Sequence, residues 1–289
     1  MKPVSFSLLG FLKLVRPGNL GIVLLTQYIT AIFLAGMAST VWEILKDPKI
    51  LLLALSSISI ASAGYIINDY YDVKIDFINK PQKVVVGKLL KRKFVIISHP
   101  ILNFAGIAIG FYLSIPIGVI QLTAAILLWW YSNHLQRLPF VGNFTIAILT
   151  GASLAIVGIL YHNNELLIYV YSLFAFCATL IREVIKDIED IKGDQDFGLK
   201  TLPIIWGIRR TKKFLFVLIG TSILILIPFI PVINLPGLKV YFVILLPAVL
   251  YFCYLLFKTD TIKGFHRLST YMKIIMISGV LSMALVGLN

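Results

Sequence analysis

The residues of this sequence whose types and spacing could do chemistry together are two groups of three aspartates. Both groups follow the pattern D-x2-D-x3-D, and they comprise Asp69, Asp72 and Asp76, and then Asp187, Asp190 and Asp194. Each aspartate of the second group lies 118 residues after its counterpart in the first. At about 100° per residue, these offsets place the three carboxylates of a group within about 60° on one face of a helix.

Six carboxylates on two facing stripes would repel one another strongly in a site of low dielectric constant unless divalent cations neutralised them. Asn68 extends the first stripe, and Glu183 joins the second. Carboxylates that bind a hard cation together with substrate phosphates are the usual arrangement around Mg²⁺. The two groups therefore indicate a site in which Mg²⁺, held by these six aspartates, bridges the protein to a diphosphate.

The elements that must position these aspartates are membrane-spanning helices. Hydrophobic residues make up 59% of the chain, charged residues 13%, and the mean hydropathy is +0.93, which lies outside the range of soluble domains. A span needs roughly 20 mostly apolar residues. We predict nine spans, at about 20–38, 49–67, 94–113, 115–131, 144–161, 165–182, 214–232, 239–257 and 270–288. Without any linker or low-complexity tract, the predicted fold is an all-α membrane protein that forms one domain, residues 1–289.

The distribution of basic residues predicts the orientation of these helices. With nine spans and the N-terminus inside, all but three of the 26 Lys and Arg residues fall on the inner side or at adjoining helix ends; the exceptions are Lys46, Lys49 and Lys239. This asymmetry follows the positive-inside rule. The net charge of +13 therefore indicates the cytoplasmic rim of a multi-pass cell-membrane protein in contact with lipid headgroups, and not a nucleic-acid-binding surface. Both aspartate groups are then expected to face the cytoplasm.

Other metal or redox chemistry has little support in the sequence. Cys177 and Cys253 each lie in a predicted span, with neither a disulfide framework nor the spacing of a metal site. The four histidines are scattered without a ligand spacing, which argues against a zinc site.

Both aspartate groups belong to longer motifs. The first motif reads Asn68-Asp69-x2-Asp72-x3-Asp76-x2-Asn79-x-Pro81-x-Lys83. The second reads Arg182-Glu183-x2-Lys186-Asp187-x-Glu189-Asp190-x2-Gly193-Asp194, followed by Lys200-Thr201-Leu202-Pro203. Over essentially its whole length, the chain resembles the UbiA superfamily of intramembrane prenyltransferases, and most closely the branch of digeranylgeranylglyceryl phosphate synthases, which make archaeal-type ether lipids. Further matches are Arg16-Pro17-x-Asn19, Tyr131-Ser132 and Gly142-Asn143.

The resemblance implies nine transmembrane helices around a central cavity, in which the two motifs bind Mg²⁺ and a prenyl diphosphate beneath cytoplasmic cap loops. The sequence departs from the family pattern at two places. Lys83 replaces the usual Arg, so a single ammonium group takes the place of a guanidinium that can form two parallel hydrogen bonds to a phosphate. In the stretch after Tyr131, where the family often carries a Lys, either His134 or Arg137 could supply the phosphate contact.

The resemblance also implies roles for single residues. The carboxylates expected to carry the chemistry, by holding the Mg²⁺ that stabilises the departing diphosphate, are Asp72, Asp76, Asp190 and Asp194. The residues expected to bind substrate are Arg16, Asn19, Asn68, Lys83, Tyr131, Ser132, Lys186 and Lys200. An allylic cation formed in this way needs a dry pocket, and aromatic faces can stabilise it.

The sequence indicates the acceptor of the prenyl group less directly than it indicates the diphosphate donor. We expect geranylgeranyl diphosphate as donor and geranylgeranylglyceryl phosphate as lipophilic acceptor, because the second motif favours the ether-lipid branch. An aromatic acceptor of quinone biosynthesis, 4-hydroxybenzoate or a dihydroxynaphthoate, is the alternative. The sequence leaves the length of the donor chain and the oligomeric state open.

Two other classes of membrane protein fit the sequence less well. A CDP-alcohol phosphotransferase packs its acids into one continuous motif, D-x2-D-G followed by A-R, which this chain does not contain. A secondary transporter gathers ionisable residues on broken helices near the middle of the bilayer, whereas the interiors of the predicted spans here are almost free of charge.

Overall fold

The computed structural model describes residues 7–36, 41–79, 81–82, 84–229 and 235–286. In these residues the regular structure is helical, apart from one isolated bridge between Val86 and Leu90. The helices are α1 (Leu8–Val15), α2 (Pro17–Thr30) with its continuation η1 (Ala31–Ala35), α3 (Val41–Lys46), α4 (Pro48–Tyr71), α5 (Val73–Asn79), α6 (Arg92–Leu113), α7 (Ile115–Asn133), η2 (Leu135–Arg137), α8 (Val141–Tyr161), α9 (Glu165–Glu189), α10 (Ile191–Asp196), α11 (Leu202–Leu226), α13 (Pro236–Lys258), α14 (Ile262–Ser282) and η3 (Met283–Leu285).

Eight of the described helical segments are long and apolar enough to cross a membrane. They correspond to eight of the nine predicted spans, so the all-α membrane fold is confirmed. The ninth prediction, 214–232, falls on the later part of α11 and continues beyond residue 229, outside the described residues. The count of nine therefore stays a prediction, as does the assignment of residues 1–289 to one domain.

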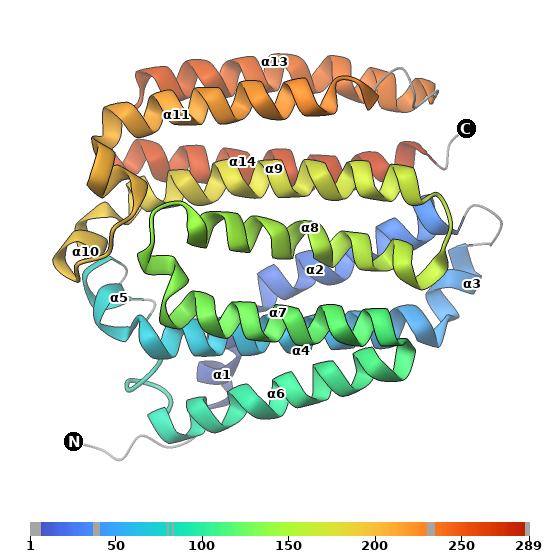
Figure 1. The fold of residues 1–289 in the computed structure, drawn as a ribbon, viewed down its shortest axis with the longest axis horizontal. Helices are drawn as coiled ribbons and strands as arrows, with labels where there is room; N and C mark the ends of the chain where they lie inside the picture. Colours follow the sequence, from blue (N-terminus) through green and yellow to red (C-terminus); the bar gives the residue numbers. More distant parts are fainter. Residues whose placement is uncertain (1–6, 37–40, 80, 83, 230–234, 287–289) are drawn as a thin grey trace.

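The long helices lie side by side and run in nearly the same direction or opposite to it (Figure 1). Helix α4 packs against α6 and α7, α8 packs against α9, and α9 also contacts α11 and α14. The short helices α5 and α10 lie together at one end of the bundle, at the left in Figure 1, and they contact each other. This end carries both aspartate motifs.

Both motifs sit where a long helix ends and a short one begins. Asp72, with φ −89° and ψ 6°, separates α4 from α5, and Asp190, with φ −95° and ψ 5°, separates α9 from α10. Helical hydrogen bonds nevertheless continue across each junction, from Asp76 N to Asp72 O at 2.8 Å and from Asp194 N to Asp190 O at 3.2 Å. The carboxylates of each motif thus follow one another along a helical path, although each path changes helix at its middle aspartate.

Candidate active site

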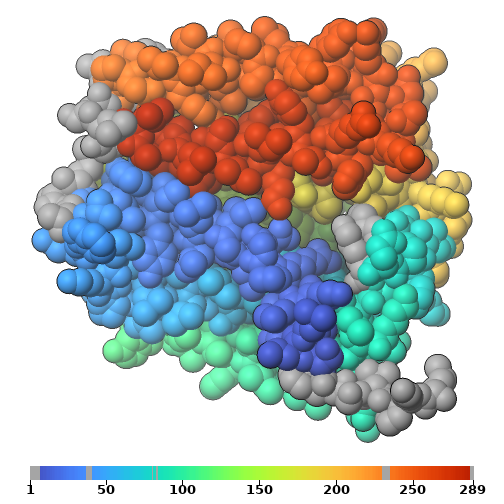
Figure 2. All heavy atoms as spheres, turned by 180° about the vertical axis from the view of Figure 1, so that it is seen from behind, coloured from blue at the N-terminus to red at the C-terminus, as the bar shows by residue number. Residues whose placement is uncertain are grey.

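A cavity of about 1240 Å³ opens at the end of the bundle that carries the motifs, and all six motif aspartates line it. Its walls come from α1, α2, α4, α5, α7, α8, α9, α10 and α14. Seen from the opposite side of the molecule, the surface is hollowed between α2 (blue) and α14 (red), and the yellow-green atoms of deeper helices are visible there (Figure 2). The polar motif end of the cavity continues into a mostly apolar interior lined by side chains such as Leu127, Leu149 and Ile277, with a few polar ones such as Gln121 and Ser153.

The first motif is held by side chains from other helices. Arg16 lies between α1 and α2 with a positive φ of 55°, and its Nη2 donates to Asp69 Oδ1 at 2.5 Å. The guanidinium also lies over the ring of Tyr65, 5.0 Å from the centroid. A buried carboxylate needs such a partner, because desolvation of an unpaired charge is costly.

The middle aspartate of this motif accepts hydrogen bonds from two amides. Asn68 Nδ2 donates to Asp72 Oδ2 and Gln136 Nε2 donates to Asp72 Oδ1, each at 2.7 Å. Burial raises the pKa of Asp72 to about 7, and Asp76 and Asp69 add to this rise, while the hydrogen bonds from Gln136 and Asn68 oppose it. The neighbouring negative charges of Asp69 and Asp76 favour the approach of a cation to this carboxylate.

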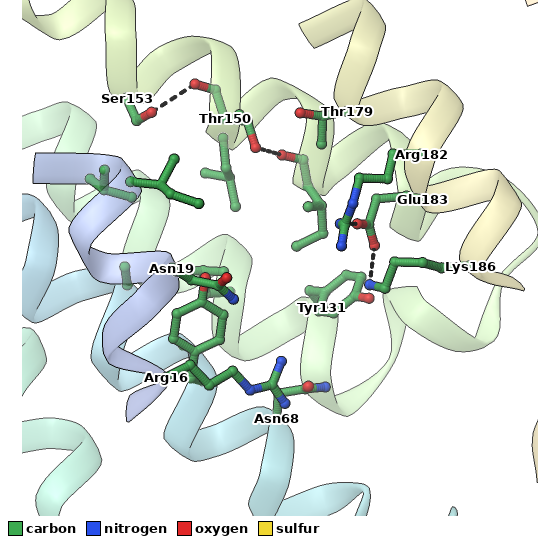
Figure 3. Close-up of a pocket in the computed structure, with 18 of the residues that line it drawn as sticks. Arg16, Asn19, Asn68, Tyr131, Thr150, Ser153, Thr179, Arg182, Glu183 and Lys186 are labelled. Atoms are coloured by element: carbon green, nitrogen blue, oxygen red, sulfur yellow. Dashed lines mark hydrogen bonds and ion pairs between the residues drawn. The ribbon is translucent and has the colours of Figure 1, made fainter. Parts of the chain in front are cut away.

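The second motif contains a compact charged group at the end of α9. Glu183 is buried, and its two carboxylate oxygens contact Arg182 Nη1 at 2.9 Å and Lys186 Nζ at 2.8 Å. Asn143 of α8 donates to Asp187 Oδ2 at 3.0 Å. Figure 3 shows the charged group beside Tyr131 on one side of the cavity, with Arg16, Asn19 and Asn68 on the other side and open space between them.

Asn79, the last residue of α5, ties the two motifs together. Its Nδ2 donates to the carbonyl oxygen of Asp190 at 3.1 Å, and its Oδ1 accepts from the backbone N–H of Gly193 at 2.9 Å. A Cβ atom on Gly193 would lie only 2.5 Å from the Asn79 amide. A larger residue here would displace the Asn79 amide and so disturb its hydrogen bonds to the α10 segment.

The donor set fits a divalent cation that is shared with phosphate oxygens. Within the described residues, no three His, Cys, Asp or Glu side chains come close enough to hold a metal ion by themselves. Mg²⁺ characteristically takes one or two carboxylates and completes an octahedral shell with water and substrate phosphates. Six cavity-lining carboxylates on two motifs match this kind of site.

The structure brings most of the expected substrate-binding residues to this cavity. Those that line it are Arg16, Asn19, Asn68, Tyr131 and Lys186. Ser132 does not line it: the side chain is buried and its hydroxyl donates to the carbonyl of Leu128 at 2.9 Å. The side chain of Lys200 is exposed and is absent from the lining, and Lys83 lies outside the described residues.

Several residues of the site have no role in the sequence-based prediction. Gln136 lies in the stretch where His134 or Arg137 was expected to reach the phosphate, but those two side chains are exposed and do not line the cavity, whereas Gln136 does. Asn79 and Asn143 belong to the motifs, yet spacing alone does not say which backbone or carboxylate they contact. Helical spacing gave no signal for Gln136, because α7 ends at Asn133 and Gln136 lies in the separate short helix η2.

The sequence pattern that defines the UbiA prenyltransferase family matches residues 24–276, which is most of the chain. The chain belongs to the UbiA prenyltransferase family. The expected resemblance is therefore confirmed, and the protein is a multi-pass membrane enzyme of the prenyltransferase class.

Relatives within the UbiA family point to one branch. The chain is 32% identical over 277 residues to the digeranylgeranylglyceryl phosphate synthase of Methanosphaera stadtmanae, covering 95% of this chain and 98% of the relative. It is 35% identical over 285 residues to the synthase of the same name from Saccharolobus solfataricus, covering 96% and 97%.

Solved structures agree with this UbiA-family fold. A structure of digeranylgeranylglyceryl phosphate synthase superposes with a TM-score of 0.74 at 25% identity, over 97% of this chain and 98% of the other. A UbiA homologue from Archaeoglobus fulgidus bound to GPP and Mg²⁺ superposes with a TM-score of 0.66 at 15% identity, over 95% and 99% of the two chains. The second likeness concerns the fold alone.

Proposed function

We propose that this UbiA-family enzyme transfers the geranylgeranyl group of geranylgeranyl diphosphate to a hydroxyl of geranylgeranylglyceryl phosphate, with Mg²⁺ as cofactor. The observation that carries the proposal is the single cavity that combines six aspartates at its polar end with an apolar interior. Diphosphate and Mg²⁺ match the polar end, and a prenyl chain matches the interior. The two relatives named digeranylgeranylglyceryl phosphate synthase, aligned over nearly their full length, support the choice of acceptor.

The residues that would hold Mg²⁺ are the motif carboxylates Asp69, Asp72, Asp76, Asp187, Asp190 and Asp194. When bound, Mg²⁺ supplies Lewis-acid stabilisation of the leaving diphosphate. A UbiA homologue with the same fold binds Mg²⁺ together with GPP, which supports Mg²⁺ as the cofactor. Of the six carboxylates, we assign the chemistry to Asp72, Asp76, Asp190 and Asp194, because Asp69 is already paired with Arg16 and Asp187 already accepts a hydrogen bond from Asn143.

Polar and basic side chains around the motifs would bind and orient the phosphates. Arg16 and Lys186 face the cavity from opposite walls, and Asn68 and Gln136 orient the Asp72 carboxylate. Charge-assisted hydrogen bonds of this kind are about twice as strong as neutral ones. Lys83, Ser132 and Lys200 stay predictions as phosphate or substrate contacts.

The apolar interior would exclude water while the allylic C–O bond of the donor breaks. Water in the site would capture the cationic carbon in place of the acceptor. The rings of Tyr131 and Tyr65 line the cavity near the motifs, and a desolvated aromatic face stabilises a cation by about 2 kcal/mol. The acceptor hydroxyl then forms the new C–O ether bond at that carbon and loses its proton.

The test is an assay in membranes with geranylgeranyl diphosphate and a panel of acceptors, with products identified by mass. We expect the ether product with geranylgeranylglyceryl phosphate. Transfer to 4-hydroxybenzoate or a dihydroxynaphthoate, and not to geranylgeranylglyceryl phosphate, would overturn the proposed acceptor but leave the proposed prenyl transfer intact. Absence of transfer from any prenyl diphosphate would overturn the function.

We also propose that both motifs face the cytoplasm of the cell membrane. The support is the concentration of Lys and Arg in the segments at the motif end of the bundle. In a variant without Cys177 and Cys253, a cysteine at position 196 should be protected from impermeant reagents in whole cells, and one at position 163 should react. The reverse pattern would overturn this orientation.

A further inference from the structure

Six basic side chains line the cavity: Lys13, Arg16, Arg182, Lys186, His266 and Lys273. Four of them contact a carboxylate, since Arg16 contacts Asp69, Arg182 and Lys186 contact Glu183, and His266 contacts Glu189. Among residues 7–36, 41–79, 81–82, 84–229 and 235–286, no acidic side chain lies within ion-pair distance of Lys13 or Lys273. Lys13 is exposed on α1, whereas Lys273 is half-buried on α14.

Lys273 occupies an unusual place for a cation. It lies eleven residues after α14 begins at Ile262, inside a helix that is long and apolar enough to span the membrane. Its Nζ is 3.5 Å from Asn19 Oδ1, the one polar contact that the described structure gives it. A lysine within a membrane-spanning segment is expensive and is by default a candidate functional residue.

In the part of the chain that the structure describes, Lys273 is connected to the first motif through a chain of contacts but does not contact the motif itself. Asn19 belongs to the first turn of α2, and its backbone N–H donates to the carbonyl of Arg16 at 2.9 Å. Arg16 in turn contacts Asp69. Two residues, Asn19 and Arg16, therefore link Lys273 to the motif, and Lys273 lines the same cavity from α14.

The walls of this cavity change character one turn below Lys273. On α14 the next cavity-lining residues are Met276 and Ile277, and on α2 the residues after Asn19 that line the cavity are Ile22 and Val23. A polar rim above an apolar slot matches an amphipathic ligand with an anionic head and a hydrocarbon tail. A membrane glycerolipid with a phosphomonoester head has this form.

We propose that Lys273 binds the phosphate of the acceptor lipid, whose prenyl chain lies in the apolar slot between α2 and α14. The inference rests on the proposed function, which requires the cavity to hold two phosphorylated substrates at once. The diphosphate belongs at the six carboxylates with their cations, so the second phosphate needs positive charge elsewhere. Lys273 supplies it as a flexible point charge that no carboxylate neutralises, and lysine is a common phosphate ligand of this kind.

The test combines a change in the protein with a change in the ligand. Initial rates are measured for wild type, Lys273→Gln and Lys273→Arg with geranylgeranylglyceryl phosphate and with geranylgeranylglycerol, which lacks the phosphate. Lys263→Gln is the matched control, because Lys263 is exposed on the same helix and does not line the cavity. We expect Lys273→Gln to raise the KM for the phosphorylated acceptor at least about tenfold, to leave the KM for the donor unchanged, and to abolish the preference for the phosphorylated acceptor. Lys273→Arg should retain most of that preference.

Two results would overturn the inference. One is an unchanged preference for the phosphorylated acceptor in Lys273→Gln. The other is a higher KM for the donor with every acceptor, which would make Lys273 a contact of the diphosphate. If Lys273→Gln does not fold, Lys273→Met, which suits an apolar slot better, replaces it in the same comparison.

A binding measurement separates this inference from the proposed function. The melting temperature of the purified protein in detergent is recorded with each of the two lipids and without donor. Stabilisation by the phosphorylated lipid that is lost in Lys273→Gln supports the phosphate site even if no prenyl transfer occurs, in which case only the proposed function fails. Equal stabilisation of wild type and variant by both lipids overturns the phosphate site whatever the transfer assay shows.

Discussion

The two aspartate motifs share their spacing and their break at the middle aspartate, but the protein supports them in different ways. None of the residues Val73–Asn79 of α5 is buried, whereas α10 buries Gly193 and Asp194. The end of α9 packs Val184, Ile185 and Ile188 into a core shared with α11, α13 and α14. The end of α4 also packs Ile66 into a smaller core, with Tyr70 and Val73 against it. The difference therefore lies in the short helices: α5 buries no residue and is joined to α10 by the hydrogen bonds of Asn79, whereas α10 is partly buried.

This difference suggests a division of labour between the motifs. The second motif provides a fixed platform, because buried aliphatic side chains hold its helix in place. The first motif is positioned on it by Arg16, Gln136 and Asn79. Substitutions in the first motif should therefore affect activity more than stability, and those in the second should affect both.

The largest effect is expected where the two motifs are equivalent. Asp72→Asn and Asp190→Asn should each lower turnover by about 10³-fold or more, since each removes a charge from the proposed cation site. EDTA should abolish wild-type activity, and added Mg²⁺ should restore it. Turnover is measured in membranes, and melting temperature and membrane insertion serve as the controls for folding. Activity that persists in EDTA would contradict the metal-dependent mechanism for both motifs alike.

A smaller effect is expected at the contact that joins the motifs. Asn79→Ala removes both hydrogen bonds to the α10 segment, and Gly193→Ala places a methyl group against the Asn79 amide. Each should reduce turnover by about 10- to 100-fold through misalignment of the carboxylates. The double variant should be little worse than either single one, because both break the same contact. Additive losses would show that the motifs are positioned independently.

The amides that contact each motif allow the comparison to be sharpened. Gln136→Leu leaves Asp72 with one hydrogen bond fewer at the cavity surface, so it should raise the Mg²⁺ concentration needed for half-maximal activity several-fold with little loss of stability. Asn143→Leu leaves the carboxylate of Asp187 without its amide donor, and such a loss costs about 1–3 kcal/mol. Its main effect should be a lower melting temperature. Equal effects on stability would contradict the proposed difference between the motifs.

The sequence predicted that the three aspartates of each group share one helical face, and it predicted eight spans. Both predictions depend on local rules, namely helical spacing and apolar length. It did not predict that each stripe changes helix at Asp72 and Asp190, because offsets of three and seven fit a continuous helix equally well. Gln136 and Lys273 were missed for another reason. They reach the cavity from η2 and α14, and only tertiary packing brings these segments beside the motifs.

The smallest effect is expected at Lys200, six residues after Asp194. Its backbone N–H donates to the carbonyl of Arg137 at 3.0 Å, and its neighbours Leu199 and Thr201 line the cavity while its own side chain is exposed. An exposed charge at the cavity mouth attracts phosphate weakly and is screened by salt over a Debye length of about 10 Å at 0.1 M. Lys200→Gln should therefore raise the KM for either the donor or the phosphorylated acceptor about two- to threefold at low ionic strength, and this effect should decrease as salt is added.

The ligand of Lys200 is identified by whether the substitution raises the KM for the donor or the KM for the acceptor. A contact with the donor diphosphate raises the KM for the donor with every acceptor, whereas a contact with the acceptor acts only when that acceptor carries a phosphate. Lys192→Gln on α10 is the matched control, since Lys192 is exposed and does not line the cavity. If Lys200→Gln and Lys192→Gln have the same kinetics, Lys200 contacts no substrate and contributes only to membrane orientation under the positive-inside rule. The second motif would then bind substrate through its cavity-lining residues, such as Lys186 and Asp190, without a contribution from Lys200.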